Sequence, residues 1–279
     1  MDLTRWFKIK NAREVGFTLV ELLVIIATVG ILAVLLLPAI AGTKPNSQAF
    51  QCIENQRQLT LGWQMFSGDN NGKLAPNGVT GFTPPTPTDP RLQPDGAWYQ
   101  WCPGDMSTFS LNATNFIQAG AIYPYVNSMG VYHCAADHNG YKFGPLAFPH
   151  LRSYSMNCYL SPIAGGEWHV GEGTVNFYKD TSFTKPGPSM TFVLIDENEY
   201  SINDASFVSD PAQGNFWQDI PASRHADAGA LSYADGHSEM KRWTDGKILN
   251  YKGTSGSVLG DPNSGDATWL QARATSLTN

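Results

Sequence analysis

The feature that most constrains this chain is an apolar run near its N-terminus. From position 17 to 37 the sequence is FTLVELLVIIATVGILAVLLL, and its only acidic or basic side chain is Glu21. As a helix rising about 1.5 Å per residue, this segment would measure roughly 30 Å, the thickness of a bilayer's hydrocarbon core. The ordinary alternatives for such a run are a secretory signal peptide, a plain N-terminal anchor and a buried helix of a soluble protein.

Charge is distributed unevenly around this run. Residues 1–16 carry a net charge of +2, so the remaining chain must hold −8 to reach the total of −6. This asymmetry favours a cytoplasmic N-terminus and an extracytoplasmic remainder. An acidic remainder also lacks a basic stripe for binding phosphate backbones, and we therefore expect no nucleic-acid partner.

Glu21 requires a partner if the apolar run stays in the mature protein. The AGTKP sequence after the run has no persuasive signal-peptidase site, so we expect the run to be retained. An unpaired buried carboxylate costs several kcal/mol. Cleavage between Gly16 and Phe17 would create an α-amino group about one helical turn from Glu21, in the same chain or a neighbouring one, and the two charges would neutralise each other.

The stretch from position 16 to 40, GFTLVELLVIIATVGILAVLLLPAI, resembles the N-terminus of type IV pilins and of type II secretion pseudopilins. The resemblance implies that a prepilin peptidase and methylase cleaves after Gly16 and methylates Phe17. It also implies that Glu21 is retained and that Pro38 kinks the helix. The implied protein is a structural subunit and not an enzyme. It would be a single-pass inner-membrane precursor that later joins its own copies and other pilin-like subunits in a filament at the cell surface.

The resemblance also implies a domain organisation: a cleaved leader at 1–16, a transmembrane or filament-core helix at 17–41, and an extracytoplasmic head at 42–279. The expected fold is α+β, with a long N-terminal hydrophobic helix continuing into an amphipathic helix that packs on an antiparallel β-sheet with long loops. Three- and four-residue spacing of side chains marks the amphipathic helix at Ala49, Cys52, Ile53, Gln56, Leu59, Trp63 and Phe66. Pro45 departs from the family pattern and predicts that the helix breaks and restarts there.

The rest of the head is expected to contain short elements between turns and loops. We expect a turn at 67–73, a short helix or turn at 115–126, a strand end at 131–137, a strand at 152–160 and a buried strand at 189–197 with Asp196 and Glu197 at its polar end.

A histidine and an Asp-Gly pair stand at a fixed spacing near the C-terminus. His225 is followed, after nine residues, by Asp235 and Gly236. This H-x9-DG spacing resembles the signature of a large group of prepilin-like proteins found mainly in planctomycete- and verrucomicrobia-type bacteria, and the segments CIENQRQL, HCAAD and RSYSMN resemble the same group. The Asp-Gly pair also predicts a β-hairpin with a type I′ turn.

The same motif suggests a metal site. His225, Asp235 and His237 could surround a divalent ion, with Asp196 or Glu197 as a further ligand, because imidazole and carboxylate groups suit zinc and similar ions. The simpler alternative is a histidine hydrogen-bonded to an aspartate or to a turn backbone. A hydrolase is not expected, because the chain shows no nucleophile, no H-E-x-x-H helix and no phosphate loop.

A calcium site in the C-terminal tail is a further alternative, formed from Asp261 and Asp266. No cofactor is otherwise expected.

The cysteines permit disulfides but do not determine them. Cys52, Cys102, Cys134 and Cys158 all follow the apolar run, where an oxidising compartment would allow pairing. Three pairings are possible. A candidate bridge between Cys134 and Cys158 would close a loop of about 25 residues and contribute about 3 kcal/mol by the chain-entropy model, and free buried thiols are the alternative. Their wide spacing argues against a C-x-x-C zinc knuckle.

A proline- and glycine-rich stretch at 75–105 contains Trp98, Tyr99 and Trp101. Flat rings can stack on the apolar faces of sugars, so the alternative function is a pilin-anchored surface adhesin that binds glycans. The competing interpretation is that these aromatic residues anchor the loop to the core.

Overall fold

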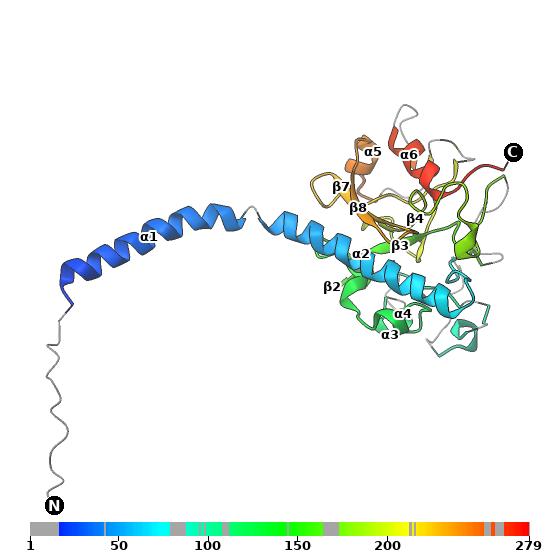
Figure 1. Cartoon of the computed structure of the whole chain (residues 1–279), viewed down its shortest axis with the longest axis horizontal. Coiled ribbons are helices and arrows are strands. Elements are labelled where there is room, and N and C mark those ends of the chain that lie inside the picture. Colours follow the sequence, from blue (N-terminus) through cyan, green and yellow to red (C-terminus); the bar gives the residue numbers. More distant parts are fainter. Residues whose placement is uncertain are drawn as a thin grey trace, which may run out of the picture. The chain divides into compact units, whose positions relative to one another are not determined.

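The structure is a computed structural model and describes most of the chain after the expected leader (Figure 1). The described residues are 17–41, 43–78, 88–94, 96–97, 99–107, 112–143, 145–163, 173–211, 214, 216–253, 258–259 and 265–278. Gly16 and the rest of the expected leader lie outside these residues. The chain divides into two compact units, Met1–Lys44 and Pro45–Asn279.

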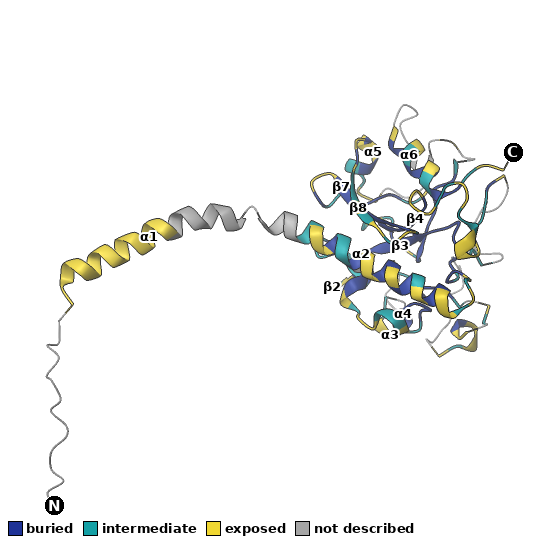
Figure 2. Cartoon of the chain, viewed as in Figure 1, coloured by how far each residue is buried: buried dark blue, intermediate teal, exposed yellow. Residues whose placement is uncertain are grey.

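The first unit contains helix α1, Leu19–Ala41. Thr18 and Glu21 form a capping box at its start. The Glu21 N–H donates to the Thr18 hydroxyl oxygen (3.2 Å), and the Thr18 N–H donates to the Glu21 carboxylate (2.9 Å). These two bonds satisfy N–H groups that have no partner within the first turn of the helix. Every residue from 17 to 32 is exposed in this chain (Figure 2).

Helix α2, Thr43–Asp69, belongs to the second unit from Pro45 onward. Pro45 lies in its first turn, where the missing proline N–H costs no helical hydrogen bond. The predicted break at Pro45 is therefore replaced by a helix that begins two residues earlier.

The expectation of a long hydrophobic helix that continues into the amphipathic helix is wrong. The chain instead forms two helices, since α1 ends at Ala41 and α2 begins at Thr43. Among the described residues, no helix has both the length and the apolar character needed to cross a membrane.

A five-stranded sheet forms the centre of the second unit, in the order β5-β3-β4-β7-β8. Its strands are β3 (Tyr154–Asn157), β4 (Phe192–Asp196), β5 (Ser206–Phe207), β7 (Ala228–Tyr233) and β8 (Ser238–Arg242). The α+β class is thus confirmed, but the sheet is not purely antiparallel as predicted. β5 runs parallel to β3, whereas the β3–β4, β4–β7 and β7–β8 pairs are antiparallel.

Helix α2 packs along this sheet with the predicted amphipathic stripe. Cys52, Gln56, Leu59, Trp63 and Phe66 are all buried, and the alternating bands of buried and exposed residues along α2 are visible in Figure 2. Three polar side chains of α2 at four-residue spacing bond to β7 and to the residue that follows it: Gln56 to the Ala230 carbonyl, Thr60 to the Ser232 hydroxyl and Gln64 to the Ala234 carbonyl. The helix is therefore aligned with β7.

Shorter elements surround the sheet and α2. They are η1 (Pro90–Leu92), α3 (Thr114–Gln118), α4 (Tyr123–Val126), η2 (Gly130–Tyr132), β1 (Gly140–Phe143), β2 (Leu146–Pro149), η3 (Asp180–Ser182), β6 (Phe216–Trp217), α5 (Gly246–Leu249), β9 (Val258–Leu259) and α6 (Gly265–Ala274). β1 pairs with β2 and β6 with β9, each in a two-stranded sheet.

Most of the predicted short elements are confirmed, and two details are wrong. The segment 115–126 contains parts of α3 and α4, and β3 and β4 lie where strands were expected. Residues 131–137, expected to end a strand, instead begin with the end of the 3₁₀ helix η2 and continue as turn. At the Asp-Gly hairpin only Gly236 has a positive φ (96°), and its N–H donates to the Tyr233 carbonyl, a type I turn followed by a left-handed glycine in place of type I′.

Candidate functional site

The structure separates the residues of the proposed H-x9-DG metal site. His225 is buried just before β7, whereas Asp235 and His237 lie beyond the other end of that strand. A six-residue strand places its ends roughly 17 Å apart. Asp235 and His237 pair with each other at 2.6 Å and keep 37% and 44% of their side-chain surface exposed. These two residues therefore stabilise an exposed hairpin turn and do not share a site with His225.

His225 instead belongs to a buried cluster with Cys52, Cys134 and Asp196. One ligand atom from each residue lies within 4.8 Å of the corresponding atoms of the other three. The Cys134 Sγ lies 3.2 Å from the His225 Nε2, the Cys52 Sγ lies 3.7 Å from the Asp196 Oδ2, and the His225 Nε2 lies 4.0 Å from the same oxygen. We call these four residues the CCDH cluster.

Four separate segments bring the CCDH cluster together. Cys52 is on the buried stripe of α2, and Asp196 is the last residue of β4. Cys134 follows η2, where its N–H donates to the Ser153 hydroxyl (3.1 Å). His225 precedes β7 at a tight turn in which Ala226 and Asp227 both have positive φ. The cluster thus joins α2 to the centre of the sheet.

Arg224 provides the positive charge beside this cluster. Its guanidinium contacts the Asp196 carboxylate directly and lies 3.4 Å from Asp137 and 3.3 Å from Glu199. A second hydrogen bond from the guanidinium reaches the Glu197 carbonyl (2.6 Å). Although burial opposes its charge, the neighbouring carboxylates of Asp196 and Asp137 raise the pKa of Arg224. Arg224 is therefore a fixed cation.

The carboxylates around Arg224 respond differently to burial. Burial would raise the pKa of Asp137, but a hydrogen bond with His150, the charge of Arg224 and a hydrogen bond from Ser153 lower it to about 2. Burial raises the pKa of Asp196 well above its usual range, and the charge of Arg224 only partly offsets this effect. Asp137 is the permanent counter-ion of Arg224.

The two thiols of the cluster have opposite tendencies. A hydrogen bond from Cys52, together with a hydrogen bond to His225 and the charge of Arg224, lowers the pKa of Cys134 to about 4 against the effect of burial. Burial raises the pKa of Cys52 well above its usual range. The pair thus consists of a thiolate at Cys134 and a thiol at Cys52, which are the groups that bind soft metal ions or undergo oxidation.

The candidate bridge between Cys134 and Cys158 is not formed, and all four cysteines are buried thiols without a disulfide. Cys134 instead faces Cys52 and His225. Sequence reasoning placed Cys52 on the packing stripe of α2 and among four cysteines whose pairing it left open, and it overlooked Arg224 next to His225. The available signal was a cysteine on the core face of a helix, but nothing in the sequence connects it to Cys134 or His225.

Other predicted site residues have structural partners. Glu197 accepts hydrogen bonds from Ser155 (2.5 Å) and Ser201 (2.9 Å), so it is not part of the CCDH cluster. Asp266, expected as a calcium ligand, instead accepts hydrogen bonds from Lys241 and from the backbone of Thr244 and Asp245. Asp261 lies outside the described residues.

Trp101 of the aromatic loop is not accessible to a glycan. Trp101 is fully buried, stacks on Tyr132 with ring centroids 6.3 Å apart and donates its indole N–H to the Ala205 carbonyl. It therefore anchors the loop to the core, as the competing interpretation held. Trp98 lies outside the described residues.

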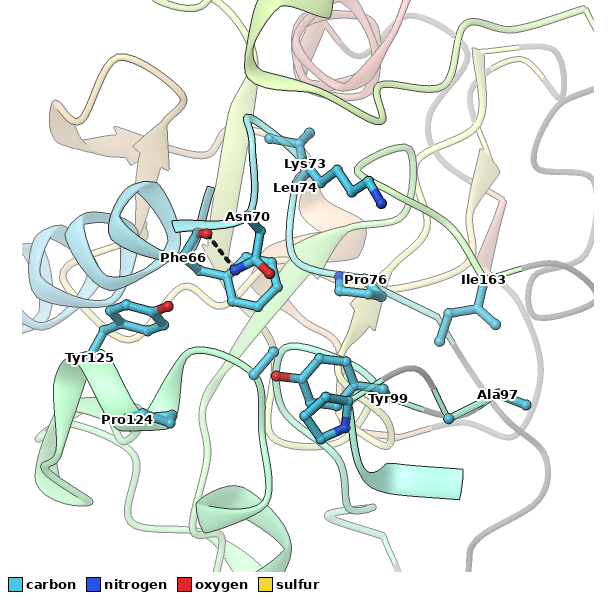
Figure 3. Close-up of a pocket in the computed structure, with 13 residues that line it drawn as sticks. Phe66, Asn70, Lys73, Leu74, Pro76, Ala97, Tyr99, Pro124, Tyr125 and Ile163 are labelled. Atoms are coloured by element: carbon cyan, nitrogen blue, oxygen red, sulfur yellow. Dashed lines mark hydrogen bonds between the residues drawn. The ribbon is translucent and has the colours of Figure 1, made fainter. Parts of the chain in front are cut away.

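A pocket of about 530 Å³ lies at the end of α2 (Figure 3). Phe66, Tyr99 and Tyr125 contribute aromatic walls to it. Two of its polar side chains are already engaged, since the Asn70 amide donates to the Phe66 carbonyl (2.8 Å) and the Tyr125 hydroxyl donates to Asp69 (3.1 Å). Without a set of converging polar groups, the pocket indicates no particular ligand.

Comparison with known proteins adds no relative: no family model matches the chain, and neither a curated protein nor a solved structure is significantly similar to it.

Proposed function

We propose that this chain is a structural subunit, a pilin or pseudopilin, of a type IV pilus-like or type II secretion-like filament. The observation that carries the proposal is the exposed apolar surface of α1. Within residues 17–32 the large side chains other than Glu21 are aliphatic or aromatic, and Phe17 and Leu19 expose 68% and 78% of their surface. Monomeric soluble proteins rarely leave so large an apolar surface in water, because burying it is strongly favourable.

The partner we propose for this surface is the α1 helix of other copies of the chain. Leader removal after Gly16 by a prepilin peptidase would make Phe17, then methylated, the first residue of the subunit. Other pilin-like subunits would contribute helices of the same kind. The proposal places the precursor at the inner membrane and the assembled subunit in an extracytoplasmic filament, and it rests here on the basic leader and the family resemblance.

Glu21 has a specific place in this proposal. In this chain its carboxylate is held by Thr18, whose N–H and hydroxyl lie 2.9 and 2.7 Å from it. A new α-amino group at Phe17 would precede the Thr18 N–H by one residue and would therefore lie close to the same carboxylate. The capping box thus keeps Glu21 oriented toward the place where the positive charge would appear, in its own chain or from a neighbour.

Substitutions at Glu21 separate helix capping from charge pairing. Glutamine can still complete a capping box, but it carries no charge. We expect Glu21→Gln and Glu21→Ala to be cleaved normally and to enter filaments at a small fraction of the wild-type level, measured by immunoblotting of sheared surface material against whole cells. The control is Glu54→Gln, which removes an exposed carboxylate on α2 that pairs only loosely with Arg57 (3.4 Å).

The two Glu21 variants have different consequences for the proposal. If Glu21→Gln assembles as well as the wild type while Glu21→Ala does not, the glutamate acts by capping α1 and the charge-pairing argument is lost. If both variants assemble fully, Glu21 has no role in filament assembly.

A further inference from the structure

We propose that the CCDH cluster is a structural zinc site, in which Cys52, Cys134, Asp196 and His225 supply the four ligands of one buried Zn²⁺ ion. This inference is independent of the filament proposal, because it concerns only the fold of the second unit.

The distances within the cluster suit a tetrahedral ion. Zinc binds sulfur at about 2.3 Å and nitrogen or oxygen at about 2.0 Å, so neighbouring ligand atoms in a tetrahedron lie about 3.3–3.8 Å apart. The measured separations are 3.2 Å from Cys134 Sγ to His225 Nε2, 3.7 Å from Cys52 Sγ to Asp196 Oδ2, and 4.0 Å from His225 Nε2 to that oxygen. Adjustments of well under an ångström would therefore bring these pairs to zinc geometry.

The charges of the ligands also favour a divalent cation. Two thiolates and one carboxylate carry three negative charges, and the neighbouring Arg224 carries one positive charge that it shares with Asp137 and Glu199. A Zn²⁺ ion would place two positive charges directly between the ligands. Since uncompensated charge in a buried site is costly, a dication makes it possible for all three acidic ligands to be ionised at once.

Groups around the ligands are placed as supports for a metal site. Arg224 holds the Oδ1 atom of Asp196 and leaves the Oδ2 atom facing the cluster. The Tyr154 hydroxyl donates to the Cys52 Sγ at 3.3 Å. Hydrogen bonds of this kind orient the ligands of metal sites and stabilise their ionised forms.

A zinc site at this cluster does not require C-x-x-C spacing, because each ligand comes from a different segment of the chain. Zinc would join α2, the η2 loop, β4 and the turn before β7, and would tie His225 of the H-x9-DG motif to the helix. A disulfide between Cys52 and Cys134 would use only two of the four groups and would leave the Asp196 carboxylate and the His225 ring without the same partners. We therefore favour the metal.

The test is metal analysis of the full-length chain, purified in detergent without chelators or reductants. We expect about one zinc per chain by inductively coupled plasma mass spectrometry. We also expect that replacement by Co²⁺ gives the thiolate charge-transfer band and intense visible bands of a tetrahedral cobalt site. Removal of the metal should lower the melting temperature, and added Zn²⁺ should restore it.

Matched cysteine variants locate the site. Cys134→Ser should lose the metal and the cobalt spectrum, whereas Cys158→Ser should keep both, because Cys158 is an equally buried cysteine outside the cluster. Metal-free protein with a Cys52–Cys134 crosslinked peptide on non-reducing mass mapping would overturn the proposal. Metal retained by Cys134→Ser, or a wild-type cobalt spectrum without thiolate bands, would also overturn it. If Cys134→Ser does not fold, the spectrum of the cobalt-substituted wild type still tests the proposal.

Discussion

Asp266 shows at the scale of one residue how a buried carboxylate holds the C-terminal part of the second unit. It lies in the first turn of α6, and one carboxylate oxygen accepts the N–H groups of Thr244 (2.5 Å) and Asp245 (2.8 Å). The other oxygen accepts from the Lys241 ammonium at 2.9 Å. The carboxylate thus connects α6 to the segment between β8 and α5 and also has a favourable position at a helix N-terminus.

Replacing Asp266 with asparagine should destabilise the protein by roughly 1.5–3 kcal/mol, the usual contribution of charge-assisted hydrogen bonds. Urea unfolding at pH 7 measures this difference. Asp227→Asn is the matched control, because Asp227 forms only an exposed pair with Arg242 at 3.5 Å and should show little change. An equal loss for the two variants would contradict the role given to Asp266.

The same carboxylate predicts a pH dependence. Burial alone would raise the pKa of Asp266, but Lys241 and the backbone N–H groups of Thr244 and Asp245 outweigh it and lower the pKa below the ordinary 3.8. The stabilisation is therefore fully present above the pKa of the unfolded state and disappears as the pH falls through the lower folded-state pKa. The stability difference between wild type and Asp266→Asn should shrink at acidic pH, and a constant difference would argue against this linkage.

Some single-residue roles could be read from the sequence, and others depended on distant partners. The Thr18-x-x-Glu21 pattern before an apolar run is a local capping signal, although the only partner predicted for Glu21 was the new α-amino group at Phe17, of the same or a neighbouring chain. The contacts of Asp266 could not be predicted from the sequence, because the turn between β8 and α5 brings the donors at Lys241 and Thr244 to this carboxylate.

At the scale of elements, the spacing of side chains along one face of α2 matches the spacing of side chains along one face of β7. Four helical residues advance about 6.0 Å and two strand residues about 6.7 Å, so side chains at positions 56, 60 and 64 meet positions 230, 232 and 234 in sequence. Thr60 forms the central contact, a buried hydrogen bond of 2.6 Å to Ser232. This polar ladder fixes the register between the helix and the sheet.

A double-mutant cycle tests the ladder. Thr60→Val removes one partner and leaves the Ser232 hydroxyl buried without it, at a cost of about 1–3 kcal/mol. Adding Ser232→Ala removes the second polar group, so the double variant should lose less than the sum of the two single losses. Chemical denaturation of the four proteins measures the coupling. Additive losses would show that this contact does not link the two elements energetically.

The local elements were more predictable than their arrangement. Periodic apolar residues correctly predicted α2, the run before Asp196 predicted β4, and the Asp-Gly pair predicted the hairpin of β7 and β8. The parallel strand β5 was missed because only Ser206 and Phe207 form it, and two residues carry no alternation. The separation of α1 from α2 was predicted at the wrong place, since Pro45 indicated a break there, whereas α1 ends at Ala41 and α2 begins at Thr43.

At the scale of the whole molecule, each unit has its own organising feature. The first unit presents apolar side chains that find no partner among its own described residues, and the second contains a sheet with the CCDH cluster near its centre. Sequence reasoning located His225 and proposed Asp196 as its neighbour, but it paired His225 with Asp235 and His237, which lie beyond the far end of β7. Long-range folding brings Cys52 and Cys134 to His225, and neither spacing nor composition indicates that contact.

The central claim is that α1 remains in the processed subunit and forms its contacts with other copies. The most direct measurement is mass spectrometry of the N-terminal peptide from sheared, sedimentable surface filaments that contain this chain. We predict a peptide that begins at Phe17 and carries one additional methyl group on its α-amino nitrogen. Surface material whose first residue lies downstream of Ala41 would lack the helix altogether and would contradict the account.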